Sequence, residues 1–203
     1  MIRRRTFLGA GGLVLLSACG QEGPPVSGVT TSEWHGTHLS DGGAPLPDVT
    51  LTDQHGQPYN LAKDPKTKAV ALFFGYTNCP DVCPGIMADM ATAKRRLPEA
   101  LVDDVTLILV TTDPARDTPE ALAEYLARVD ESFIGLTGDL EAIKPAALSL
   151  GVDIAKGKEL PSGGYEVDHG SYVLGFGEDR KLAVVWNQAS INDLKEDFVR
   201  LIG

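Results

Sequence analysis

Residues 69–84 read AVALFFGYTNCPDVCP, and they decide the fold because they pass from an apolar run into the start of a helix. The first eight residues are almost continuously apolar, which is typical of a central strand covered on both faces. A helix is expected over about 83–97, since Pro84 is tolerated in a first helical turn. Cys79 and Cys83 therefore lie where the strand gives way to the helix.

Strands and helices alternate on both sides of this stretch, and a β-hairpin comes late in the chain. The other expected strands are Asp48–Thr52, Gln57–Leu61, Val105–Thr112 and Phe133–Thr137, and the expected hairpin pairs Tyr165–Phe176 with Lys181–Trp186. The other expected helices are Pro119–Val129, Leu140–Leu150 and Ile191–Leu201. This order predicts an α/β sandwich with a mixed central sheet flanked by helices, plus the late β-hairpin.

The composition is that of a soluble globular domain. The chain has 203 residues, of which 43% are hydrophobic and 23% charged, and this length is ample for a buried core. Its formal net charge of −10 argues against nucleic acid as a partner, because phosphate contacts need clustered Lys and Arg. Three cysteines are too few for a scaffold held together by disulfides.

The N-terminal residues have the pattern of an export signal. Three arginines at 3–5 precede a mostly apolar stretch over 7–16, which is too short to span a bilayer and is typical of a secretory signal. The signal ends in Leu-Ser-Ala-Cys19, which resembles the lipobox of bacterial lipoproteins, in which cleavage precedes a lipidated cysteine. Residues 4–8 resemble a twin-arginine export motif, and the general secretory route is the alternative.

These patterns predict three segments. Residues 1–18 are expected to be a lipoprotein signal peptide, 19–44 a flexible tether rich in Gly, Pro, Ser and Thr, and 45–203 a single domain. His35 and His38 are interpreted as solvated residues of the tether. The mature chain is expected on the outer face of the cytoplasmic membrane, outside the cytoplasm, held by the lipid on Cys19.

Two cysteines separated by three residues can form a disulfide or share one metal ion. The positive end of the following helix is expected to favour thiolate over thiol. Thiolates select Cu(I) or Zn, and a structural zinc site is normally closed by four protein ligands. The predicted domain has only two cysteines and two histidines, His55 and His169, so a copper site with His169 is a candidate. A cycling dithiol remains open, whereas a structural disulfide would close too small a loop to stabilise much.

Three segments in order resemble the SCO1/SenC family of copper chaperones: TNCPDVCP (77–84), DPARDTPE (113–120) and VDHGSYVLG (167–175). The resemblance implies a thioredoxin-like fold. It also implies a copper site made by Cys79, Cys83 and His169, which holds Cu(I) and can retain Cu(II). The chain departs from the family at Gly170, where Ser or Thr is common, and in its lipid anchor, which replaces the transmembrane helix of many relatives.

The resemblance also implies a function. Such a protein is primarily a metallochaperone, which takes copper from an extracytoplasmic donor and helps assemble the dinuclear copper centre in subunit II of cytochrome c oxidase. The alternative is a thiol–disulfide oxidoreductase that keeps the cysteines of the oxidase or of other exported proteins reduced. The three-residue spacing and the absence of proline from 165–172 favour the metal function. A peroxidase and a purely structural domain are weaker alternatives.

Two acidic residues are candidates to support the site. Asp113 follows the expected strand 105–112. It either supports the metal ligands or the docking of a partner, or it is simply an acidic residue of a turn. Asp168 precedes His169 and is a candidate to tune the imidazole, although adjacent side chains of a strand point apart.

Overall fold

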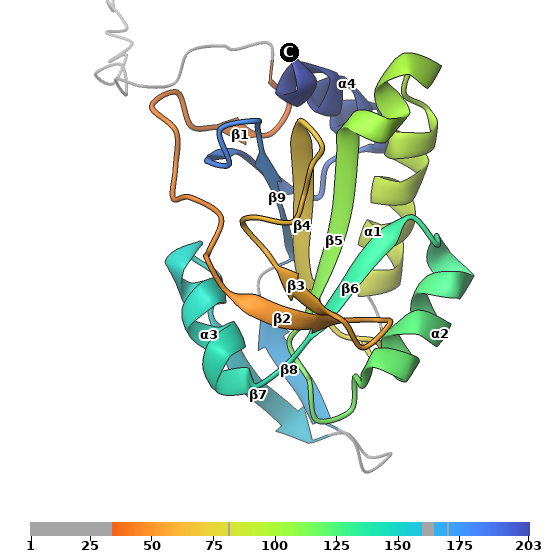
Figure 1. The fold of residues 1–203 in the computed structure, drawn as a ribbon, viewed down its shortest axis with the longest axis vertical. Helices are drawn as coiled ribbons and strands as arrows, with labels where there is room; N and C mark the ends of the chain where they lie inside the picture. The colour runs from red at the N-terminus through yellow and green to blue at the C-terminus, as the bar shows by residue number, and fades with distance from the viewer. Residues whose placement is uncertain (1–33, 81, 160–164, 170) are drawn as a thin grey trace, which may run out of the picture.

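The computed structural model describes residues 34–80, 82–159, 165–169 and 171–203, and it contains two sheets and four α-helices (Figure 1). The larger sheet has the strand order β1-β10-β9-β4-β5-β6-β2-β3. Its strands are β1 (Thr37–His38), β2 (Thr50–Asp53), β3 (Pro58–Asn60), β4 (Ala69–Gly75), β5 (Val105–Thr111), β6 (Phe133–Thr137), β9 (Tyr172–Phe176) and β10 (Leu182–Asn187). The smaller sheet pairs β7 (Ile154–Glu159) with β8 (Tyr165–His169).

The helices are α1 (Val82–Arg95), α2 (Pro119–Val129), α3 (Leu140–Ser149) and α4 (Ile191–Ile202), and a 3₁₀ turn covers Glu99–Asp104. Helix α1 packs against both α2 and α4, and α3 packs against β7. Figure 1 shows α3 on the left of the view and α1 and α2 on the right. The predicted mixed sheet flanked by helices is therefore confirmed.

Strand β4 is the centre of the large sheet. All seven of its residues are buried, as the apolar run predicts. It runs parallel to β5 and antiparallel to β9. Because β4 and β5 are parallel, their carboxyl ends meet at one edge of the sheet, and both the cysteine loop and the loop before α2 start there.

The late hairpin is confirmed only in part. Strand β9 pairs with β10 as predicted, but the single long strand expected over 165–176 is wrong. Its first part is β8, which leaves the large sheet and pairs with β7. The sequence did not reveal β7, since Ile154–Glu159 reads IAKGKE and carries one large apolar residue. Strand β8 ends at His169 and β9 begins at Tyr172, and the sequence between them contains a glycine, a residue that weakens a strand interior.

The end of the predicted tether packs on the domain. Strand β1 pairs with β10, the rings of Trp34 and His38 stack with centroids 4.7 Å apart, and Leu39 packs against the core. The expectation that 34–44 is a solvated tether is therefore wrong, and the fold begins before residue 45. The signal peptide and Cys19 lie outside the described residues.

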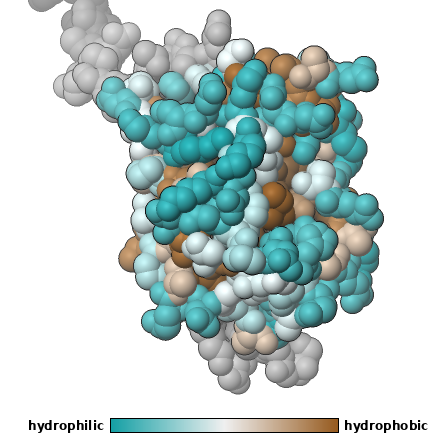
Figure 2. Space-filling view, in the orientation of Figure 1, coloured by the Kyte–Doolittle hydropathy of each residue, from teal (hydrophilic) through white to brown (hydrophobic). Residues whose placement is uncertain are grey.

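The described part of the chain contains no helix long and apolar enough to cross a membrane. Figure 2 shows a largely hydrophilic face, on which the hydrophobic residues gather in a narrow strip. Large exposed hydrophobic side chains among the described residues are Val82, Leu148 and Tyr172.

Candidate metal centre

Cys79 and Cys83 lie on either side of the start of α1. Strand β4 ends at Gly75, and the backbone N–H of Cys79 donates to the carbonyl of Tyr76 at 3.2 Å, which closes a tight turn after the strand. Cys83 is the second residue of α1 and is fully buried, whereas Cys79 is partly exposed. The two cysteines are not joined by a disulfide. The pair therefore has one sulfur in the core and one nearer the surface.

The two thiols contact each other. The hydrogen bond with Cys79, and then burial, raise the pKa of Cys83 far above its ordinary value. Hydrogen bonds from the backbone at Tyr76 and Cys83 act in the opposite direction but are outweighed. The expected preference for thiolate at the start of the helix is therefore outweighed at Cys83 by its partner thiol and by burial. The shared proton lies between two soft ligand atoms, where a soft cation would replace it.

Asp117 holds the loop in front of Cys79. Its carboxylate is fully buried and accepts hydrogen bonds from Thr77 N at 3.0 Å, Thr77 Oγ1 at 2.6 Å and Thr111 Oγ1 at 2.6 Å. One side chain thereby ties the loop after β5 to the loop after β4. The sequence did not reveal this role of Asp117, whose neighbour Thr118 caps α2.

Asp113 is built into the neighbouring turn. It is 3% exposed, its carbonyl accepts from the N–H groups of Arg116 and Asp117, and its carboxylate is ion-paired with the Arg116 guanidinium. That guanidinium lies 5.8 Å from the centre of the Tyr76 ring, directly before the cysteine loop. The position at the sheet edge agrees with the sequence, and the influence of Asp113 on the site remains a prediction.

The backbone of His169 approaches the same edge of the sheet. In the antiparallel pair of β9 and β4, Val173 lies opposite Phe73, so the chain enters β9 from the carboxyl end of β4. His169 is four residues before Val173, a span of at most about 14 Å even if fully extended. Figure 1 shows β8 at the lower end of the molecule, where β5 runs into the loop before α2.

The backbone of His169 pairs with Ile154 and that of Asp168 with Ala155. The side chains of residues 156–170 lie outside the described part of the structure. The contact between the imidazole and the two sulfurs therefore stays a prediction, as does the influence of Asp168 on the ring.

A small cleft of about 50 Å³ connects the segment after His169 with α1. Ile86 and Asp89 line it from α1, and Ser171 and Val173 line it from the start of β9. Ile86 is three residues after Cys83, and Ser171 is two residues after His169. The chain around His169 is thus next to the first turns of the cysteine-bearing helix.

The other candidates do not gather here. His55, the other histidine of the predicted domain, is exposed in the β2–β3 turn, where its N–H donates to Asp53 Oδ1 at 2.8 Å. Among the side chains that the structure describes, no group of three His, Cys, Asp or Glu forms a metal cluster.

The SCO1/SenC family model matches residues 42–202. The chain belongs to the SCO1/SenC family. Relatives include a protein of Stutzerimonas stutzeri, 36% identical over 137 residues that make up 68% of this chain and 66% of that one. Protein sco1 of Schizosaccharomyces pombe is 33% identical over 156 residues, 76% of this chain and 58% of that one. The match thus leaves a third or more of these two relatives unaligned.

Solved structures of SCO proteins share the fold. ScoI of Bradyrhizobium japonicum with copper bound is 31% identical with a TM-score of 0.68, covering 79% of this chain and 98% of that one. Apo Sco1 of Thermus thermophilus is 32% identical with a TM-score of 0.68, and the match covers 85% of this chain and 95% of that one. The predicted thioredoxin-like fold of this SCO protein is confirmed.

Proposed function

We propose that this SCO protein is a metallochaperone that carries copper on Cys79, Cys83 and His169 for the assembly of cytochrome c oxidase. One observation carries the proposal: two reduced thiols share a hydrogen bond at the start of α1, one buried and one partly exposed. The copper bound in the solved ScoI relatives from Bradyrhizobium japonicum and Arabidopsis thaliana supports the same cargo.

The chemistry of the donor set fits copper better than zinc. Thiolates are soft ligands that suit Cu(I), and two of them with one imidazole make a three-coordinate site. A structural zinc site is normally closed by four protein ligands. The imidazole of His169 completes the set and lets the site retain Cu(II). Copper displaces the thiol protons, so its affinity falls in acid.

Release of the cargo follows from the position of the sulfurs. Cys79 is partly exposed in a loop, so a partner's ligands can reach the metal on that side and take it by exchange. The partner in this proposal is subunit II of the oxidase, whose dinuclear copper centre the carrier helps to fill. An extracytoplasmic donor loads the carrier.

The proposed location is the outer face of the cytoplasmic membrane, with the lipid on Cys19 as the anchor. A SCO1/SenC family lipoprotein from Bacillus anthracis, 26% identical with a TM-score of 0.67, supports this anchor. The Cys19→Ser variant is then expected in the soluble extracytoplasmic fraction, whereas the parent stays with the membrane. A parent chain found in the soluble fraction would contradict the anchor.

An anaerobic titration of the reduced protein with Cu(I) tests the ligand set. We expect one copper per chain, a large loss of affinity in Cys79→Ser and Cys83→Ser, and a smaller loss with no retention of Cu(II) in His169→Ala. His55→Ala is the matched control and should bind like the parent. Parental binding by His169→Ala would show that the third ligand is misassigned, and parental binding by the double cysteine variant would refute the proposal.

The contact between the thiols also favours a second candidate, a thiol–disulfide oxidoreductase. Here the dithiol becomes a Cys79–Cys83 disulfide and passes two electrons and two protons to a disulfide of the substrate, which becomes a dithiol. The disulfide removes both sulfur ligands, so this activity and copper binding exclude each other. Oxidase assembly in cells that carry His169→Ala separates the two: the metal function predicts its loss, and the redox function predicts that it persists.

A further inference from the structure

The hydroxyl of Tyr125 is buried without a hydrogen bond to any residue that the structure describes. The side chain is 8% exposed and belongs to α2. Buried hydroxyl groups nearly always have a partner, because an unmade hydrogen bond leaves the desolvation of the group uncompensated. An unpaired hydroxyl therefore points to a partner that the described residues do not supply.

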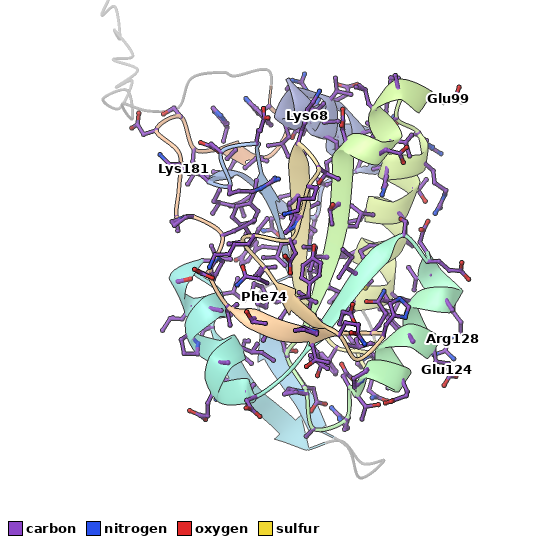
Figure 3. All side chains as sticks on the ribbon, in the orientation of Figure 1. Lys68, Phe74, Glu99, Glu124, Arg128 and Lys181 are labelled. Atoms are coloured by element: carbon purple, nitrogen blue, oxygen red, sulfur yellow. The ribbon has the colours of Figure 1, made fainter. Side chains whose placement is uncertain are left out.

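The packing of α2 directs Tyr125 into the molecule. Leu122 and Leu126 are buried, and both pack around Gly135 of β6. Glu124 and Arg128 pair with each other at 2.8 Å on the outer side of the helix, where Figure 3 labels them. Tyr125 is three residues after Leu122 and directly precedes Leu126, so it lies on the same inward face of the helix as these two leucines.

The ionisable groups that act on this hydroxyl are those of the cysteine site. Burial, followed by the nearby groups Cys83, Cys79 and Asp117, raises the pKa of Tyr125 to about 12, against a lowering effect of Arg128. Helix α2 also packs against α1, which carries Cys83. The hydroxyl thus keeps its proton at neutral pH and lies within electrostatic range of both sulfurs.

We propose that Tyr125 is a positioning residue whose hydroxyl donates a hydrogen bond to a cysteine sulfur when the pair holds copper. This inference rests on the proposed function. A thiolate sulfur is a much stronger acceptor than a thiol, because hydrogen bonds to ionised groups are about twice as strong as neutral ones. In the reduced, copper-free pair the sulfurs are occupied with each other, which leaves the hydroxyl of Tyr125 without a partner.

The test compares Tyr125→Phe with Tyr59→Phe in the reduced full chain. Tyr59 is a suitable control because it also has a partly buried phenol, on the β3 strand, with a pKa raised by burial to about 12. We expect Tyr125→Phe to lower the Cu(I) affinity about tenfold, a typical effect for one hydrogen bond to a charged group. The sulfur-to-Cu(II) absorption band should move to lower energy, because the sulfur electrons lose a stabilising proton. Tyr59→Phe should change neither quantity.

The thermal unfolding of the copper-free variants separates the hydrogen bond from simple packing. Tyr125→Phe should unfold at the parental temperature or slightly above it, since it removes an unpaired buried hydroxyl. Parental affinity with an unmoved band would overturn the inference, and so would an affinity loss matched by an equal loss of stability in the copper-free protein. The double cysteine variant keeps the two claims apart: if it loses copper while Tyr125→Phe does not, the proposed function stands and this inference fails.

Discussion

Asp117 shows how a single buried carboxylate fixes a reactive loop. Its three hydrogen bonds come from Thr77 and Thr111, which follow or end neighbouring parallel strands. The bonds to Thr77 set the chain direction two residues before Cys79. A residue outside the proposed ligand set therefore holds the chain that leads into Cys79.

Replacing Asp117 by alanine should destabilise the fold and loosen the site. Three donors would lose a buried charged acceptor, which costs about 3 kcal/mol of unfolding free energy. Urea unfolding measures this loss, and Cu(I) titration should show weaker binding although both cysteines are present. Asp139→Ala is the control, since Asp139 is exposed and makes no cap hydrogen bond with its side chain. Parental urea midpoints and parental copper binding in Asp117→Ala would refute this role.

At the residue scale, the sequence predicts local chemistry well and distant contacts poorly. Cys79 and Cys83 are four positions apart, so any loop that enters a helix keeps them close. Asp117 contacts Thr77, forty residues upstream, and nothing in the local pattern tells its buried carboxylate from the many exposed ones. Tyr125 was missed for the same reason, because it resembles an ordinary core residue of an amphipathic helix.

At the scale of elements, Asp197 in α4 fastens the N-terminal segment to the domain. The carboxylate is fully buried and accepts from the backbone N–H groups of His35 and Gly36, from Trp186 Nε1 at 2.7 Å and from Arg200 at 3.0 Å. This anchor explains why residues 34–44 are packed although they have no apolar period. Their order depends on a partner about 160 residues away.

Asp197→Ala should therefore release the segment around His35. We expect a loss of about 3–5 kcal/mol of unfolding free energy, because the Arg200 charge, the buried Trp186 N–H and two backbone N–H groups lose their acceptor. Limited proteolysis should then cut the chain before residue 45 faster than in the parent. Glu178→Ala, at an exposed turn, is the control. Unchanged cleavage of Asp197→Ala would contradict the anchor.

Helix starts were predictable because their signals are local. Thr118 caps α2, and Ser190 and Asp193 form a capping box at α4, so both signals lie within a few positions of the helix start. Strand β7 was missed and β8 was placed in the wrong sheet. These two strands form by pairing with each other, and no apolar pattern in the sequence marks that pairing.

At the scale of the whole molecule, the contact between the N-terminal segment and α4 makes stability depend on pH. His35 Nε2 lies 2.8 Å from Glu196 and Nδ1 lies 3.4 Å from Asp193. The hydrogen bond with Glu196 raises the pKa of His35, against a small opposing effect of burial. The hydrogen bond with Ser190 lowers the pKa of Asp193, and the hydrogen bond with His35 lowers the pKa of Glu196.

The sign of each shift sets the pH window. A raised histidine pKa stabilises the fold below about pH 6.5, the unfolded value, and this contribution is lost as the pH rises through the folded value. The lowered pKa values of the two carboxyl groups stabilise the fold at pH values above the unfolded pKa, and this stabilisation is lost in acid. His35→Gln should thus lower the melting temperature more at about pH 5.5 than at about pH 8. The effect should be small because the groups are exposed, and an equal decrease at both pH values would contradict it.

The overall architecture was predictable because alternating apolar strands and amphipathic helices admit few arrangements. The position of His169 was not, because it depends on how β8 leaves the large sheet just before β9. The register of β9 on β4 brings this part of the chain to the cysteine edge and makes the three-ligand site geometrically reasonable.

X-ray absorption at the copper edge, on the reduced protein loaded with one Cu(I), tests the ligand set most directly. The account predicts two sulfur ligands and one nitrogen ligand in the parent, and the loss of the nitrogen alone in His169→Ala. A copper ion that keeps its nitrogen in His169→Ala, or that has no sulfur ligand in the parent, would contradict it.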